Sequence, residues 1–116
     1  MTPGLERGGV YRIDLGTPRG HEQRGRRLGI VMSPSAMPWS VATVVPTSTT
    51  ARAAVFRPRL TILGRNTTVL VDQIRSIDTD YVDGPPVAYL TRDQLGEVED
   101  ALSRYLGLVP GFPYGP

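Results

Sequence analysis

The chain has 116 residues, which is enough for one layered domain and leaves little room for a second. It contains no cysteine and a single histidine, so disulfide scaffolds, cysteine-based zinc sites, thiol nucleophiles and multi-histidine metal sites are excluded. All 13 basic residues are arginine, which excludes a P-loop and a Schiff-base lysine and leaves guanidinium groups that suit phosphate.

The net charge of +2 conceals an uneven distribution of charge along the chain. Residues 1–65 carry 10 arginines against 3 acidic residues, whereas residues 66–116 carry 3 arginines against 8 acidic residues. A basic half favours an anionic partner, unless the halves interleave in the fold and their charges average out. The sequence has neither a transmembrane-length apolar segment nor a signal-peptide core, so we expect a cytoplasmic protein with no membrane partner.

The first part of the chain predicts two strands joined by a polar connection. After a loosely held lead over residues 1–8, alternating apolar and polar residues predict a half-buried strand over 9–15. A continuous apolar run predicts a buried strand over 28–32. Glycines, a proline and charged residues fill 16–26, which we expect to be an exposed, mobile loop.

The middle of the chain predicts further short strands separated by turn residues. In chain order they are a strand over 41–45 that Pro46 ends, an edge strand or two short strands over 53–63, a turn at 64–66, a strand over 67–71 that 73–77 continues, a turn at 83–86 and a strand over 87–90.

The hydrophobic period changes from two to about 3.6 after residue 90. Thr91 and Gln94 have the spacing of a capping box, and Gly107 suits a helix stop, so we predict one amphipathic helix over 92–106. Six or seven short strands and one C-terminal helix favour a mainly β fold, a small and strongly bent antiparallel barrel with the helix packed on it. We expect a single domain with a core over about 7–108 and a tail over 109–116.

The first group of chemically capable residues lies in the glycine-rich loop and at the strand that follows it: Arg19, His21, Glu22, Gln23, Arg24, Arg26 and Arg27. Arginines on such a loop can wrap a phosphate backbone, and the histidine titrates near neutral pH. The alternative is a solvated, charged loop.

Two shorter groups follow at strand ends. Thr47, Ser48 and Thr49 can hydrogen-bond a phosphate or a ribose, although hydroxyl residues at this position also cap turns. Asp72 and Gln73 interrupt an apolar run. A carboxylate there is either paired with an arginine for structure or held where its pKa is useful.

Taken together, these segments resemble the MazF/PemK/Kid toxins of bacterial toxin–antitoxin systems. The likeness is carried in register by Arg7-Gly8-Gly9-Val10-Tyr11, the Gly-His-Glu-Gln-x-Gly-x-Arg motif that Arg27 closes, Ser33-Pro34, Val45-Pro46-Thr47-Ser48, Val71-Asp72-Gln73 with the residues up to Asp78, and Leu106-Gly107-Leu108. It covers about residues 7–108.

The resemblance implies an SH3-like β-barrel that forms a homodimer and cleaves single-stranded RNA without a metal or another cofactor. It implies catalytic roles for Arg27, Ser48, Asp72 and His21. Neighbouring residues are expected to bind RNA, namely Arg19, Glu22, Gln23, Arg24, Arg26, Thr47, Thr49, Gln73 and Arg75. It also implies neutralisation by a cognate MazE-like antitoxin whose acidic, disordered tail suits the arginine-rich loop.

The chain departs from the family pattern in two places. One branch of the family has an arginine two positions before the aspartate, and here that position is Leu70. The family usually has a proline after the first motif, where this chain has Leu28-Gly29.

The RNA supplies its own nucleophile, the 2′-hydroxyl, so the protein needs a base, a cation and an acid. His21 and Asp72 are both candidates for the base, and the choice between acid and base stays open. Three alternatives are a gyrase-binding toxin of the same fold, an SH3-like binding module, and a family member that has lost catalysis.

Overall fold

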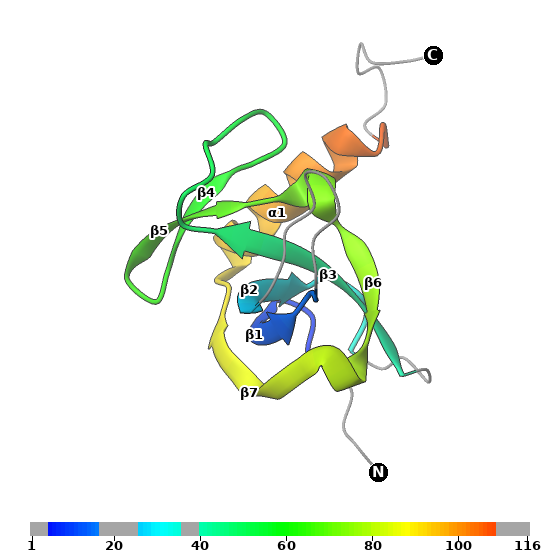
Figure 1. Cartoon of the computed structure of the whole chain (residues 1–116). Coiled ribbons are helices and arrows are strands. Elements are labelled where there is room, and N and C mark those ends of the chain that lie inside the picture. Colours follow the sequence, from blue (N-terminus) through cyan, green and yellow to red (C-terminus); the bar gives the residue numbers. More distant parts are fainter. Residues whose placement is uncertain (1–4, 17–25, 36–39, 109–116) are drawn as a thin grey trace.

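The structure is a computed structural model that describes residues 5–16, 26–35 and 40–108. The predicted tail over 109–116 lies outside these residues. The elements, in chain order, are β1 (Gly9–Asp14), β2 (Arg26–Val31), β3 (Val41–Ser48), β4 (Arg59–Ile62), β5 (Arg65–Val69), the 3-10 turn η1 (Val71–Gln73), β6 (Arg75–Asp78), the 3-10 turn η2 (Thr79–Tyr81), β7 (Val82–Tyr89) and helix α1 (Arg92–Tyr105) (Figure 1).

All the strand pairs are antiparallel, and the strand order is β4-β5-β3-β2-β1-β7, with β6 also paired to β3. The sheet curls into a half-barrel, from which the β4–β5 hairpin projects on the side away from β6 (Figure 1). The predicted fold class, mainly antiparallel β with one C-terminal helix, is confirmed.

Strand β3 organises the sheet because it changes partner along its length. On one side it pairs with β2. On the other side its first half, Val41–Val44, pairs with β6, and its end, Thr47 and Ser48, pairs with β5. The turn η1 joins β5 to β6 at this change of partner, so the predicted Asp72-Gln73 motif lies opposite the middle of β3.

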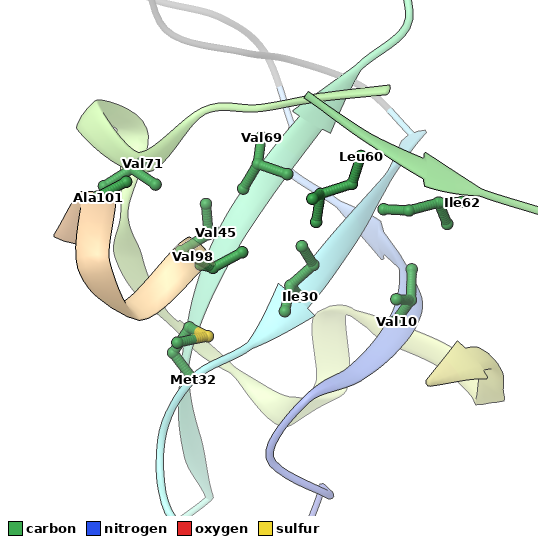
Figure 2. Close-up of a cluster of buried hydrophobic side chains, with 10 residues drawn as sticks. All are labelled: Val10, Ile30, Met32, Val45, Leu60, Ile62, Val69, Val71, Val98 and Ala101. Atoms are coloured by element: carbon green, nitrogen blue, oxygen red, sulfur yellow. The ribbon is translucent and has the colours of Figure 1, made fainter. Parts of the chain in front are cut away.

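The main core lies between the sheet, the β4–β5 hairpin and helix α1 (Figure 2). Val98 and Ala101 of the helix meet Val45 and Val71, and the hairpin adds further apolar side chains on the other side of the cluster. A second cluster fills the inside of the curl: Tyr11, Ile13, Leu15, Val31, Ala42, Val44 and Ile77. Alternate residues of each central strand therefore serve different cores, as the two-residue period of a strand requires.

Three sequence expectations are corrected at prolines and at the lead. Pro46 does not end its strand, because it lies between the stretches of β3 that pair with β6 and with β5, where its missing N–H costs no ladder bond. The predicted turn at 83–86 lies inside one continuous strand, β7. Its register against β1 jumps from Ala88 to Asp83, and the two prolines fall in this irregularity.

The predicted loose lead is wrong for residues 5–8, which are tied to the body of the fold. The Gly8 amide donates to the Val31 carbonyl at 2.8 Å. The Arg7 guanidinium donates to the Met32 carbonyl at 2.6 Å and pairs with Glu99 of α1. This segment therefore fastens the start of the chain to its last helix.

Helix α1 begins with the predicted capping box, which is confirmed. The Thr91 hydroxyl accepts from the Gln94 amide at 3.1 Å, and the Gln94 side chain accepts from the Thr91 amide at 3.0 Å. Replacing Thr91 by alanine is expected to lower the free energy of unfolding by about 1 kcal/mol, because the Gln94 amide loses the hydroxyl that accepts its hydrogen bond. Urea denaturation measures this, with Thr91→Ser as the control that keeps the cap. An alanine variant as stable as the serine variant would contradict it.

Candidate functional site

The predicted site residues divide into two sets. Five of them lie outside the described residues: Arg19, His21, Glu22, Gln23 and Arg24. The others are described and occupy the ends of β2 and β3, the turn η1 and strand β6: Arg26, Arg27, Thr47, Ser48, Thr49, Asp72, Gln73 and Arg75. Arg26 was expected in the loop, and the structure corrects this by making it the first residue of β2.

The first part of the site is the place where β2 begins and β3 ends. The two strands are in register from Gly29 opposite Pro46, and the Thr47 hydroxyl donates to the Leu28 carbonyl at 2.8 Å. Arg27 and Ser48 are the next residues along these strands. They therefore stand at neighbouring strand ends, with Arg27 half-buried and paired to β1.

Gly29, the second residue of the Leu28-Gly29 departure, has a packing reason. A Cβ atom on Gly29 would lie 2.4 Å from Cδ1 of Ile13, which is closer than two carbon atoms can approach. Ile13 of β1 is almost fully buried and lies across β2 at this point. Glycine at position 29 thus leaves space for Ile13 of the second cluster, close to Arg27 in the chain.

The Ser48 hydroxyl caps a turn. Its oxygen accepts from the amides of Thr50 at 3.2 Å and of Ala51 at 3.0 Å, and it lies 3.2 Å from the Thr50 hydroxyl. Ser48 is only 4% exposed. Turn capping, the alternative weighed for this hydroxyl cluster, is therefore seen in the structure, and it fixes the chain that follows β3.

Asp72 forms a two-point ion pair with Arg57, a residue that the sequence reasoning missed. Arg57 Nε donates to Oδ1 at 2.8 Å, and Nη2 donates to Oδ2 at 2.7 Å. These hydrogen bonds hold the pKa of Asp72 below its ordinary value, against the opposing effect of burial, and they raise the pKa of Arg57. Asp72 is therefore ionised at neutral pH and is a weak base.

The signal that could have found Arg57 was faint. It lies just before Pro58, inside the segment predicted as an edge strand, where the structure has an isolated bridge between Ala54 and Arg57. One of the two alternatives left open for Asp72 was pairing with an arginine. Only the folded chain shows which arginine reaches it, because the two residues are 15 positions apart.

The pair predicts how stability depends on pH. Because the pKa of Asp72 is lowered in the folded state, its contribution is fully present above its unfolded pKa of about 4 and is lost as the pH falls through the folded value. We expect the difference in unfolding free energy between wild type and Asp72→Asn to be constant near neutral pH and to shrink below about pH 4. Urea titrations at constant ionic strength measure it. A difference that is equal at neutral and acidic pH would contradict this.

A charged cavity of about 580 Å³ opens beside Arg27, between β1, β2, η2 and the start of β7. Three arginines and three aspartates line it: Arg12, Arg26, Arg27, Asp14, Asp80 and Asp83. A smaller cavity of about 220 Å³ is lined by Arg75, Asp78 and Tyr81, and Asp14 lines both cavities.

The basic and acidic halves of the chain interleave in the fold. Arg57 meets Asp72 and Arg7 meets Glu99, and in both pairs the arginine comes from residues 1–65 and the acid from residues 66–116. The large cavity also brings arginines from residues 1–65 together with Asp80 and Asp83 from residues 66–116. The uneven charge of the sequence therefore becomes a set of local arginine–carboxylate arrangements in the part of the molecule that the structure describes.

The sequence profile of a known family matches residues 6–106, and its description reads "PemK-like, MazF-like toxin of type II toxin-antitoxin system". The chain belongs to this toxin family. The resemblance inferred from the sequence is thus confirmed. In the described part of this MazF-like toxin, no helix is long and apolar enough to cross a membrane. The same residues contain no group of three or more His, Cys, Asp or Glu side chains that could hold a metal ion.

Three relatives illustrate the likeness. A Mycobacterium tuberculosis protein named "Putative toxin Rv3098A/RVBD_3098A" is 63% identical over 103 residues, which cover 88% of this chain and 97% of that protein. MazF from Deinococcus radiodurans is 30% identical, with a TM-score of 0.79 over 90% of this chain and 97% of that one. A mycobacterial endoribonuclease, solved in complex with its cognate antitoxin, is 24% identical with a TM-score of 0.74 over 89% and 95%, and it shows likeness of fold alone.

Proposed function

We propose that this MazF-like toxin is an endoribonuclease that cleaves single-stranded mRNA at selected sequences without a metal ion. The observation that carries the proposal is the junction of β2 and β3, where Arg27 and Ser48 stand at neighbouring strand ends beside a cavity with three arginines. A half-buried arginine held by a sheet is a preorganised donor for phosphate oxygens.

The chemistry needs few protein groups because the RNA supplies its nucleophile. The 2′-oxygen attacks the adjacent phosphorus, the bond from phosphorus to the 5′-oxygen breaks, and the products are a 2′,3′-cyclic phosphate and a 5′-hydroxyl. Arg27 stabilises the negative charge that grows on the non-bridging oxygens, with the Ser48 end of β3 alongside. Hydrolysis of the cyclic phosphate gives a 3′-phosphate.

The proton must leave the 2′-hydroxyl and a proton must reach the 5′-oxygen. The ion pair with Arg57 makes Asp72 a weak base, which favours His21 as the acceptor because imidazole titrates near neutral pH. The imidazolium that forms can return its proton to the leaving 5′-oxygen, which balances the step. Asp72 then serves through its charge and its hydrogen bonds.

The same proposal includes the partners of the toxin. It assigns RNA contacts to Arg19, Glu22, Gln23, Arg24, Arg26, Thr47, Thr49, Gln73 and Arg75. A cognate antitoxin with an acidic segment can pair with the arginines of the large cavity, which three aspartates also line. The toxin acts as a homodimer in the cytoplasm, where mRNA is found.

Incubation of the purified toxin with a long single-stranded RNA in excess EDTA tests the proposal. Discrete fragments are expected, whose 5′ ends accept phosphate from a polynucleotide kinase without prior phosphatase treatment. Arg27→Ala, purified in parallel, controls for contaminating nucleases. Intact RNA after incubation with the wild type would overturn the proposal.

One observation favours a second candidate, a toxin without nuclease activity. Leu70 is fully buried and its amide donates to the Pro46 carbonyl, so this position offers no cation to a substrate. A toxin that leaves RNA intact but inhibits DNA supercoiling by gyrase would support this candidate.

A further inference from the structure

We propose that Arg57 contacts a backbone phosphate of the bound RNA and that Asp72 is the positioning residue that orients it. The inference rests on the proposed function and goes beyond it, because it adds a substrate-binding cation from the connection between β3 and β4. It also gives Asp72 a role other than that of a base.

The connection that carries Arg57 is fastened at its start. The Ser48 hydroxyl accepts from the Ala51 amide at 3.0 Å, and the Thr68 hydroxyl of β5 donates to the Ala51 carbonyl at 2.8 Å. Ser48 and Thr68 are themselves paired across β3 and β5. The chain after β3 is therefore held by hydroxyl groups from two neighbouring strands.

The connection is also fastened around Arg57 itself. The backbones of Ala54 and Arg57 exchange two hydrogen bonds, of 3.3 and 2.9 Å. The ring of Phe56 packs edge-on against Tyr105 of α1, with 5.4 Å between ring centroids, and the Pro58 carbonyl accepts from the Val69 amide at 2.8 Å. An arginine on such an anchored segment loses less conformational entropy on binding than one on a free loop.

The guanidinium keeps donors for a ligand. It has five N–H groups, and Asp72 takes one from Nε and one from Nη2. The other three have no protein partner among residues 5–16, 26–35 and 40–108. The side chain of Arg57 is 29% exposed, so it borders the solvent.

The carboxylate determines which way the guanidinium points. A two-point pair fixes the plane of the arginine, so the unused edge presents its N–H groups in one direction. Asp72 is itself 28% exposed and its pKa is lowered, so it stays charged when the pair meets an anion. A planar, oriented fork of donors is the geometry that suits two oxygens of one phosphate.

Binding of a pool of single-stranded 2′-O-methyl RNA of mixed sequence tests the inference without requiring cleavage. Arg57→Ala is expected to raise Kd about tenfold. It should also lower the slope of log Kd against log salt by about 0.7, the value for one phosphate contact on a single strand. Arg57→Lys keeps the positive charge but loses the planar pair of donors. Its Kd should therefore lie between those of the wild type and Arg57→Ala. Arg52→Ala, which removes an exposed arginine from the same connection, is the matched control and should bind like the wild type.

A second variant separates contact from structure. Arg57→Ala with Asp72→Ala removes both charges and leaves none unpaired, so a merely structural pair predicts recovery of RNA binding in the double variant. The inference predicts that binding stays weak, although thermal unfolding recovers. Wild-type Kd and salt slope in Arg57→Ala, an equal loss in Arg52→Ala, or recovery of binding in the double variant would each overturn it.

The two proposals can fail separately. If the wild type leaves RNA intact in EDTA but binds the pool through Arg57, the nuclease proposal falls and the contact stands. If the wild type cleaves RNA and Arg57→Ala binds with unchanged Kd and slope, the contact falls and the nuclease stands. A wild type that neither cleaves nor binds RNA overturns both.

Discussion

Replacing Arg27 by alanine is expected to lower kcat/KM for RNA cleavage by about a hundredfold or more, because the variant loses the donor to the charge that develops on the phosphate. The loss should appear mainly in kcat, since this interaction strengthens only as the 2′-oxygen attacks. Single-turnover cleavage of a long RNA in EDTA measures the effect. Arg27→Lys should recover a small part of the rate, because an ammonium supplies charge without the planar fork.

Arg59→Ala is the matched control for this measurement. Arg59 is an exposed arginine at the start of β4, and its removal changes the net charge by the same amount. Its cleavage rate should equal that of the wild type. Cleavage by Arg27→Ala at the wild-type rate would contradict the assignment of Arg27, whatever the other variants do.

The largest effect on stability is expected at Ile30. This residue of β2 is fully buried between Val10 and Val45 in the main core (Figure 2). Replacing it by alanine is expected to lower the free energy of unfolding by about 2–5 kcal/mol, because apolar contacts are lost and a cavity remains. That is a large fraction of the 5–15 kcal/mol typical of a domain.

Urea denaturation followed by circular dichroism measures this loss at a fixed protein concentration, since association would add its own free energy. Ile30→Val, which removes one methyl group, is the control and should cost about 0.5–1.5 kcal/mol. If the alanine variant is no less stable than the valine variant, the cluster is looser than the buried surface indicates.

The parts of the fold that follow from local patterns were predictable from the sequence. The alternation after Gly9 and the capping box at Thr91 each describe residues that are close in the chain, and both elements formed where expected. The predictions failed where distant segments decide the outcome. Pro46 looks like a strand end, and it lies within β3 only because β5 and β6 divide that strand between them.

The candidate site shows the same limit. The three motifs indicated Arg27, Ser48 and Asp72 by their residue types and order, but no pattern joins Asp72 to Arg57. That pair depends on how the connection after β3 folds back over η1, which is a property of the assembled sheet. Likewise, the sequence shows Leu70 only as the position where one branch of the family has an arginine. The structure shows that it is a fully buried apolar residue.

The closure of the half-barrel has a consequence for the newly made chain. The first strand, β1, has β7 as its second neighbour, and helix α1, which follows β7 in the chain, covers the main core. Such pairings between the two ends of a chain form late, since the intervening loop must be closed first. A chain still on the ribosome, with residues 82–105 not yet emerged, has β1 paired on one side only, an uncovered Val45 and no Glu99 for Arg7. The scaffold behind Arg27 is therefore complete only once residues 82–105 have joined it.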